Sequence, residues 1–211
     1  MDLFRHLDPR LRDGLAAEFG RRAVEPAEGL PRGVTLVLAG HRGAGKSTVL
    51  PFVASALNRP AIDLDVELER RAGRSVRSWF EADVASFRAA EREVFASLPA
   101  GAVVAVGGGF LSLHGDLLRD CHTVLVPVTW ETFVERLTAD TSRPRLRPEL
   151  SLQQELEAIW AEREAKHQQV KTVSFVDLVL SVRRPSRARR VVTLPPGVDA
   201  VSFATKAMKR G

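Results

Sequence analysis

The segment Val34-Thr-Leu-Val-Leu-Ala39 runs directly into Gly40-His-Arg-Gly-Ala-Gly45-Lys46-Ser47-Thr48. The first six residues form a mostly apolar run rich in Val and Leu, which is typical of a strand buried on both faces of a parallel sheet. The second segment satisfies the pattern GxxxxGK[ST] and is followed by a helical pattern. In such a loop, glycines let backbone N–H groups surround phosphate oxygens at a helix N-terminus. The stretch therefore predicts an α/β fold that binds a nucleoside triphosphate.

The side chains of this loop have separate expected roles. Lys46 should reach the β- and γ-phosphates, and the Ser47 hydroxyl should ligate Mg²⁺. The rest of the expected nucleotide cradle is Gly40, Gly43, Ala44, Gly45 and Thr48. His41 and Arg42 also lie in the loop, where solvent exposure is the simplest interpretation. The loop thus predicts a nucleoside triphosphate with Mg²⁺ as the ligand pair.

Further apolar runs alternate with helical patterns along the chain. The runs that predict strands are residues 60–63, 102–106, 123–126 and 177–182. The helical patterns cover residues 47–57, 65–72, 85–98, 130–137 and 152–169. This alternation favours a three-layer P-loop fold in which helices flank a five-stranded parallel sheet.

Composition is that of a folded protein with one main domain. The chain has 211 residues, of which 45% are hydrophobic and 27% are charged, and these values disfavour disorder. We expect an N-terminal extension and linker over 1–33 and the P-loop domain over 34–184. Residues 185–211 form a basic linker with an appended strand and helix, or the start of a second domain. The net charge of +5 includes the arginine-rich stretch 183–190, which leaves nucleic-acid binding as a weaker alternative.

Cysteine and histidine usage restricts the other chemistries. Cys121 is the one cysteine, so an intrachain disulfide or a cysteine-based zinc site cannot form. The five histidines show no HxxxH or HExxH spacing, which disfavours a protein-ligated transition metal. No apolar run approaches the ~18 residues needed to span a bilayer. We therefore expect a cytoplasmic protein without a membrane segment.

Polar residues follow the second predicted strand. Asp63 and Asp65 flank Leu64 at its carboxyl end, where open α/β sheets bind ligands. Strand alternation would point both carboxylates the same way, one toward Mg²⁺ and the other toward an acceptor hydroxyl. The alternative for Asp65 is a helix-capping role.

Three further motifs extend the candidate site. Arg88 and Glu91 stand three residues apart on a predicted helix, where a carboxylate can hold a guanidinium. Gly107, Gly108 and Gly109 follow the third strand, and three glycines in succession favour close approach of a ligand to the backbone. The proline-punctuated segment 143–148 suits a lid whose Arg143 reaches the transferring phosphate, and the alternative is an ordinary basic surface loop.

In this order, the motifs resemble those of the shikimate kinase family over about residues 34–184. The resemblance implies ATP-dependent phosphorylation of the 3-hydroxyl of shikimate by a nucleoside-monophosphate-kinase-like fold. It assigns shikimate binding to Asp65, Arg88, Gly108 and Arg163, with Gly107 and Gly109 beside them. It implies that Lys46, Ser47 and Asp63 bind the triphosphate and its metal ion. It also implies that Arg143 is the lid arginine and that Arg136 lies near the adenine. Lys46, Asp65 and Arg143 are then the catalytic residues of a monomeric enzyme.

Some positions depart from the family pattern. Leu50 and Pro51 replace a Gly and a basic residue, and Pro51 should kink its helix because it lacks the N–H that would bond Ser47. The segment 83–86, with Val84, replaces a Gly-Glu turn, and Lys166-His167 replaces Leu-Tyr, exchanging apolar packing for charge. These departures leave two alternatives open: a shikimate-kinase-like sensor of another small acid, and a kinase for a related polyol acid such as gluconate.

Overall fold

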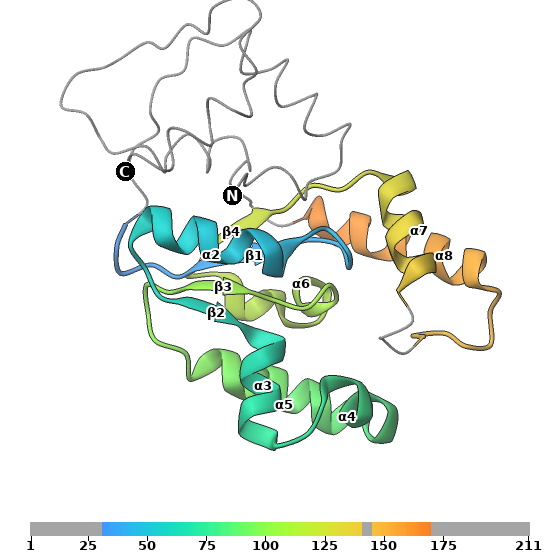
Figure 1. The fold of residues 1–211 in the computed structure, drawn as a ribbon, viewed down its shortest axis with the longest axis horizontal. Coiled ribbons are helices and arrows are strands. Elements are labelled where there is room, and N and C mark those ends of the chain that lie inside the picture. Colours follow the sequence, from blue (N-terminus) through green and yellow to red (C-terminus); the bar gives the residue numbers. More distant parts are fainter. Residues whose placement is uncertain (1–30, 141–144, 170–211) are drawn as a thin grey trace, which may run out of the picture.

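The computed structural model describes residues 31–140 and 145–169. In this part of the chain, a parallel sheet has the strands β1 (Leu36–Ala39), β2 (Ala61–Asp63), β3 (Val103–Ala105) and β4 (His122–Leu125). The order across the sheet is β2-β3-β1-β4, with Leu36 opposite both Val103 and His122. The sheet carries helices around it (Figure 1). The α/β class and the parallel sheet are confirmed.

The described sheet has four strands instead of the five expected from the sequence. The run predicted as the fifth strand, residues 177–182, lies outside the described residues. The same holds for residues 1–30 of the extension predicted over 1–33 and for the basic segment 185–211. The P-loop strand β1 still lies inside the sheet, because β3 and β4 pair with its two edges.

The helices are α2 (Lys46–Leu57), α3 (Leu64–Ala72), α4 (Val76–Ala82), α5 (Val84–Ala96), α6 (Phe110–His114), α7 (Trp130–Ala139) and α8 (Leu152–His167), with a 3₁₀ turn η1 (Gly115–Leu118). Helix α2 covers the sheet over β2 and β3, whereas α3, α4 and α5 form a group beyond the sheet (Figure 1). Helices α7 and α8 pack together at the other side. None of the described helices is long and apolar enough to cross a membrane.

The core explains why β1 is a continuous apolar run. All four residues of β1 are fully buried. Val37 and Ala39 join one core with Leu64 and Leu68 of α3 and with Phe87 of α5. A second cluster joins α7 to α8. Burial of the strand on both faces fixes the position of the loop that leaves its carboxyl end.

Side-chain caps mark the N-termini of α5 and α8, and α8 begins at residue 152 as predicted. Asp83 accepts a hydrogen bond from Ser86 N and starts α5 one residue before the predicted Ala85. Ser151 and Gln154 form a capping box that starts α8. Such caps satisfy the N–H groups that a first helical turn leaves without intrahelical partners.

Helix α2 tolerates the proline that was expected to kink it. Pro51 lies on the exposed side of α2, and the helix continues without interruption from Lys46 to Leu57. Leu50, the other departure in this helix, is buried in the core. The helix begins after Gly45, whose φ of 91° is a left-handed conformation that suits glycine. This start places Lys46 and Ser47 in the first turn, facing the loop.

Candidate active site

The loop between β1 and α2 has the backbone shape of a phosphate-binding nest. Gly40, Gly43 and Gly45 all have positive φ angles, which L side chains rarely adopt. A Cβ at Gly40 would also lie 2.8 Å from the Val126 carbonyl oxygen. The Lys46 ammonium is buried and donates hydrogen bonds to the carbonyls of Gly40 at 3.0 Å and His41 at 2.7 Å. It is therefore held over the loop by partners that phosphate oxygens can replace.

A cleft of about 500 Å³ opens in front of this loop. Its lining includes Lys46, Ser47, Thr48, Asp63, Asp65, Gly107, Gly108 and Arg136. The Arg136 side chain bonds back to the loop, with Nη1 donating to the Gly43 carbonyl at 2.6 Å. Most of the residues predicted to bind the nucleotide therefore share one cleft, and Arg136 reaches it from α7.

Asp63 and Asp65 reach this cleft in different ways from the one expected. The strand ends at Asp63, and Asp65 lies in the first turn of α3 instead of on the strand. Asp63 is the residue that caps the helix: its Oδ1 accepts from Asp65 N at 3.1 Å. The capping alternative considered for Asp65 is thus met by Asp63. Both aspartates nevertheless line the same cleft, and Asp63 lies there with the exposed Ser47.

A second cleft of about 430 Å³ adjoins the first and shares Ser47, Asp65 and Gly108 with it. Asp65, Arg88 and Arg163, which come from α3, α5 and α8, all line it. The three glycines 107–109 line it as well. The structure therefore brings the predicted acceptor residues together beside the phosphate-binding loop.

Arg88 is positioned by a buried carboxylate. Its Nη1 donates to Glu91 Oε2 at 2.5 Å, and the Glu91 side chain is only 1% exposed. The pair was predicted from its spacing, and its burial separates it from ordinary surface pairs on helices. Burial raises the pKa of Glu91, the Arg88 guanidinium opposes that rise and the Asp65 charge adds to it. The Arg88 guanidinium also packs over the Phe80 and Phe87 rings, at 5.3 and 5.1 Å from their centroids.

Arg163 is a buried cation at the second cleft. The residue is 7% exposed, and its Nη1 atom has no hydrogen-bond partner. Burial, together with the charges of Arg42 and Arg88, lowers its pKa to about 10. A buried guanidinium whose donors lack partners is costly. A carboxylate bound in the cleft would supply both the charge and the acceptors.

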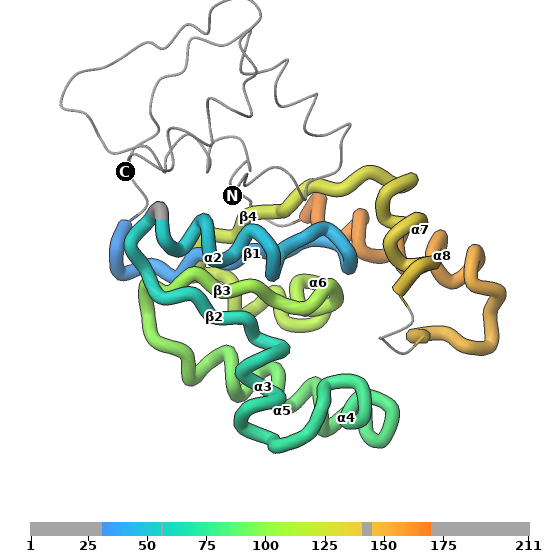
Figure 2. Tube along the Cα trace, viewed as in Figure 1, coloured from blue at the N-terminus to red at the C-terminus, as the bar shows by residue number. Residues whose placement is uncertain are grey.

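The glycines after β3 pack against the side chains of both clefts. A Cβ at Gly107 would lie 3.4 Å from Glu91 Oε1 and 3.6 Å from Asp65 Oδ1. One at Gly108 would lie 2.7 Å from the Arg42 backbone nitrogen and 2.9 Å from Arg163 Nη1. The P-loop and the turn after β3 thus lie side by side, as the chain trace shows (Figure 2). This packing gives the physical reason for glycine at 108.

We expect Gly108→Ala to push the P-loop away from this turn, because the obstructing atom is backbone. The substitution should lower the free energy of unfolding by about 1–3 kcal/mol and kcat/KM by at least about tenfold. Gly115→Ala is the matched control, since Gly115 has nothing within 4 Å of the added Cβ. Denaturant unfolding and steady-state kinetics measure both effects. Equal behaviour of the two variants would contradict the packing argument.

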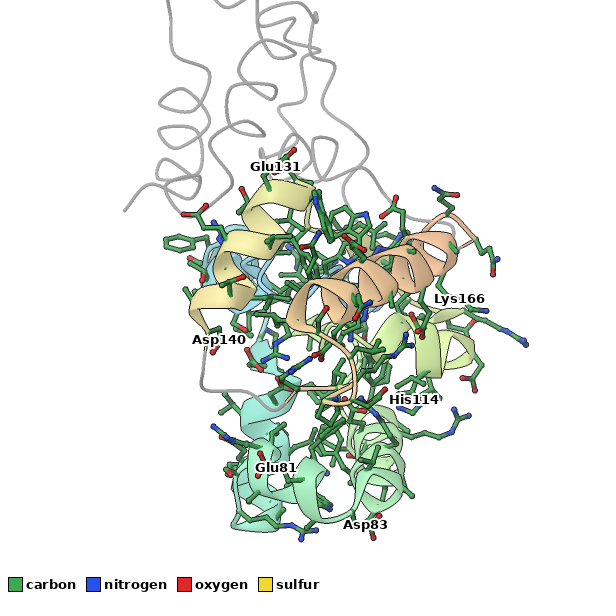
Figure 3. The ribbon with its side chains drawn as sticks, turned by 90° about the vertical axis from the view of Figure 1, so that its right-hand side faces the viewer. Glu81, Asp83, His114, Glu131, Asp140 and Lys166 are labelled. Atoms are coloured by element: carbon green, nitrogen blue, oxygen red, sulfur yellow. The ribbon has the colours of Figure 1, made fainter. Side chains whose placement is uncertain are left out.

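The segment after the predicted lid arginine is anchored by Glu155, which no sequence motif had indicated. Arg143 itself lies outside the described residues. Glu155 is buried on α8. Its carboxylate accepts hydrogen bonds from Arg145 Nε at 2.6 Å and from the backbone N–H groups of Leu146 and Arg147. Leu146 in turn lines the second cleft. A third cleft is lined by Glu81 of α4, Asp140 at the end of α7 and Glu155 of α8, and the first two of these residues are labelled in Figure 3.

Glu155→Gln should loosen this anchor in a pH-dependent way. Burial raises the pKa of Glu155, but the hydrogen bonds from Arg145, Leu146 and Arg147 together outweigh it, and the net pKa is lowered. Because the pKa of Glu155 in the folded state lies below its unfolded-state pKa of about 4.3, the ionised carboxylate stabilises the fold at pH values above 4.3. This contribution is lost as the pH falls through the folded-state pKa. We expect the substitution to cost about 2 kcal/mol at neutral pH and progressively less toward pH 3. Unfolding curves measured across pH test this, and a constant difference would refute it.

Comparison with known proteins agrees with this geometry. The family model for shikimate kinase matches residues 42–181. The chain belongs to the shikimate kinase family. A shikimate kinase from Microcystis aeruginosa is 36% identical to this chain, and the alignment covers 54% of this chain and 63% of that relative. A shikimate kinase from Thermobifida fusca is 40% identical, and the alignment covers 52% of this chain and 67% of that relative. The matched segment thus spans about two thirds of the length of these curated relatives.

A solved structure gives the same result for the fold. The shikimate kinase from Acinetobacter baumannii in complex with shikimate superposes with a TM-score of 0.58 at 27% identity. The alignment covers 70% of this chain and 88% of the other. The family resemblance found in the order of the sequence motifs is therefore confirmed, both by family membership and by the fold.

The structure also adds site residues that no motif had indicated. Phe80 of α4 lines the second cleft, and the sequence patterns did not predict this helix. Ser75, whose Oγ accepts from Ser78 N, was the available signal for the start of α4. Arg42 lines all three clefts and pairs with Asp140 at 3.7 Å, so it is not the exposed loop residue that was expected. His41, expected to be exposed, is also buried.

Proposed function

We propose that this protein transfers the γ-phosphoryl group of ATP to the 3-hydroxyl of shikimate, giving shikimate 3-phosphate and ADP. The observation that carries the proposal is the convergence of Asp65, Arg88 and Arg163 on one cleft next to the P-loop. The relative from Acinetobacter baumannii has shikimate as its ligand. Shikimate has a carboxylate and three hydroxyls, and the three residues assigned to bind it, Asp65, Arg88 and Arg163, supply one carboxylate and two guanidinium groups at this cleft.

On the donor side, we assign the triphosphate to the P-loop residues Gly40, Gly43, Ala44, Gly45 and Thr48. Lys46 exchanges its two carbonyl partners for phosphate oxygens and stabilises the charge that the transferring group carries. Because the transition state for phosphoryl transfer is loose, positioning and charge stabilisation account for most of the acceleration. We assign the same charge-stabilising role to Arg143 in the lid. We assign Arg136 a position near the adenine.

The first cleft, in front of the P-loop, offers oxygen atoms that suit Mg²⁺ as ligands. Hard oxygen ligands suit this ion, and both the Ser47 hydroxyl and the Asp63 carboxylate line the cleft. We assign these two residues to the metal. When bound, the ion would neutralise charge on the β- and γ-phosphates. Asp63 can do this while it caps α3, because a carboxylate offers about four acceptor positions.

On the acceptor side, Arg88 and Arg163 clamp the carboxylate, and Asp65 orients the hydroxyl. Planar guanidinium groups match a carboxylate with two parallel hydrogen bonds. As the oxygen of the 3-hydroxyl attacks the γ-phosphorus, Asp65 accepts the hydroxyl proton, and ADP departs with the electrons of the broken P–O bond. Glycines 107–109 allow the ring to approach the backbone.

We further propose that the enzyme acts in the cytoplasm as a monomer. All residues assigned to the two clefts come from one chain, so the chemistry needs no second copy. Reaction with ATP, and the single cysteine of the sequence, both suit a reducing, ATP-rich compartment.

A coupled assay of ADP release tests the function directly. The reaction contains Mg²⁺, ATP and one acceptor from a panel of shikimate, quinate, gluconate and none. We expect ADP release only with shikimate. Turnover with gluconate instead would give the kinase another acceptor, and no turnover with any acceptor, despite ATP binding, would favour a sensor.

A further inference from the structure

His41 and His167, which lie 126 positions apart in the sequence, meet beside Glu164 at the end of α8. One donor atom from each of the three side chains lies within 4.8 Å of the other two. His41 comes from the P-loop, while Glu164 and His167 share one face of α8, whose end is marked by Lys166 in Figure 3. Short histidine spacings in the sequence could not indicate this cluster, because the fold brings the two rings together.

The separations of the donor atoms are close to those around a small metal ion. His41 Nε2 lies 3.2 Å from Glu164 Oε2, and His167 Nδ1 lies 3.9 Å from the same oxygen. Ligands at about 2.0–2.1 Å from a tetrahedral ion lie roughly 3.4 Å apart. Two histidines with one carboxylate form a common set of three ligands for zinc, with a fourth position for water. Glu164 is 43% exposed, so solvent can reach that position.

The two imidazoles are poorly satisfied by the protein alone. Their side chains are only 6% and 5% exposed. The nitrogens near Glu164 are Nε2 of His41 and Nδ1 of His167, and the other nitrogen of each ring has no hydrogen-bond partner. Glu164 is the carboxylate that faces both rings. The sequence led us to expect that Lys166-His167 exchanges apolar packing for charge, but the His167 side chain is buried with its ring edge against His41. The simplest alternative role for the rings is therefore aromatic packing, with His41 stacked on Trp160 at 4.0 Å.

Both imidazoles are in the protonation state that binds metal. Burial and the nearby charge of Arg163 lower the pKa of His41 to about 4. Burial and the neighbouring His41 lower the pKa of His167 to about 4. A lowered imidazole pKa favours the neutral ring, which is the form that binds a metal ion. The positive charges of Lys46 and Arg163 weaken the binding of any cation at this cluster, whereas the Glu164 carboxylate strengthens it.

We propose that His41, Glu164 and His167 form a binding site for a divalent transition-metal ion, with Zn²⁺ as the reference ion. Imidazole nitrogen binds such ions strongly, whereas Mg²⁺ and Ca²⁺ depend on several oxygen ligands. The site is separate from the magnesium position at Ser47 and Asp63. A bound ion would tie the second residue of the P-loop to α8, which carries Arg163.

The test is a calorimetric titration of Zn²⁺ into the full-length protein without nucleotide and with excess Mg²⁺. We expect one Zn²⁺ per chain, and an affinity more than about 100-fold lower in Glu164→Gln and in His167→Gln, because each loses a direct ligand. His122→Gln is the matched control, since His122 lies on β4 away from the cluster. Glu164→Gln keeps the experiment interpretable if His167→Gln does not fold.

Two further readouts separate a built site from adventitious binding. Co²⁺ in place of Zn²⁺ should give the intense visible absorption of a tetrahedral site in the wild type but not in Glu164→Gln. Zn²⁺ should raise the thermal midpoint of the wild type and of His122→Gln, because a ligand that binds only the folded state stabilises it. Equal Zn²⁺ affinity in the wild type and Glu164→Gln, or the absence of stoichiometric binding, would overturn the proposal and leave the two rings as packing residues.

Discussion

Replacing Lys46 by Ala should reduce kcat by about 10³-fold, as expected when a preorganised charge is removed from a phosphoryl-transfer site. The Lys46 ammonium is buried over the loop, where two backbone carbonyls hold it. Because this environment excludes much of the water, the charge acts on the γ-phosphate with little screening. The hydrogen bonds that the substitution removes from Gly40 and His41 belong to the loop, so the sheet beneath should remain folded.

Steady-state kinetics with saturating ATP and shikimate measure this effect. Arg70→Ala is the matched control, because Arg70 is an exposed cation that pairs with Glu67 on α3 and lines neither cleft. The control should retain wild-type turnover. A Lys46→Ala enzyme that keeps more than about a tenth of the wild-type kcat would show that the loop lysine does not act on the transferring phosphate.

Replacing Arg163 by Ala should reduce kcat/KM for shikimate by about 10³-fold, mostly through KM. Two charge-assisted hydrogen bonds to a carboxylate contribute about 2 kcal/mol each, and Arg163 Nη1 has no other partner. Arg88→Ala should act in the same direction, with an added loss of stability because Glu91 then remains buried without its partner. The KM for ATP should change little in either variant.

Arg163→Lys distinguishes shape from charge at this position. Lysine keeps the positive charge but lacks the planar fork, so we expect it to recover only part of the lost affinity. Arg92→Ala is the control, since Arg92 pairs with Asp116 on the exposed side of α5. Unchanged shikimate kinetics in Arg163→Ala or Arg88→Ala would remove these residues from the acceptor site.

The parts of the site that follow strands were predictable from the sequence. The apolar run before Gly40 identifies a central strand because both of its faces are buried, and the glycine spacing fixes the loop that follows. Arg88 and Glu91 could be paired from their spacing on a helix. The convergence of Arg88 with Arg163 required the family resemblance, because no local pattern relates α5 to α8.

Other features depend on contacts between distant segments and could not be predicted in this way. Helix α4 is short, and its Ser75 cap and the packing of Trp79 determine it more than periodicity does. Asp65 was placed on a strand because alternation was extended two residues too far, past the Asp63 cap. No sequence pattern singled out Glu155, and His41 was expected to be exposed, but tertiary packing buries both.

The central claim is that one cleft holds shikimate by its carboxylate against the P-loop. A crystal structure with ADP, Mg²⁺ and shikimate tests it most directly. We predict the carboxylate within hydrogen-bonding distance of Arg88 and Arg163, and the 3-hydroxyl beside Asp65, facing the position of the γ-phosphate. Shikimate bound elsewhere, or with its carboxylate away from both arginines, would contradict the account.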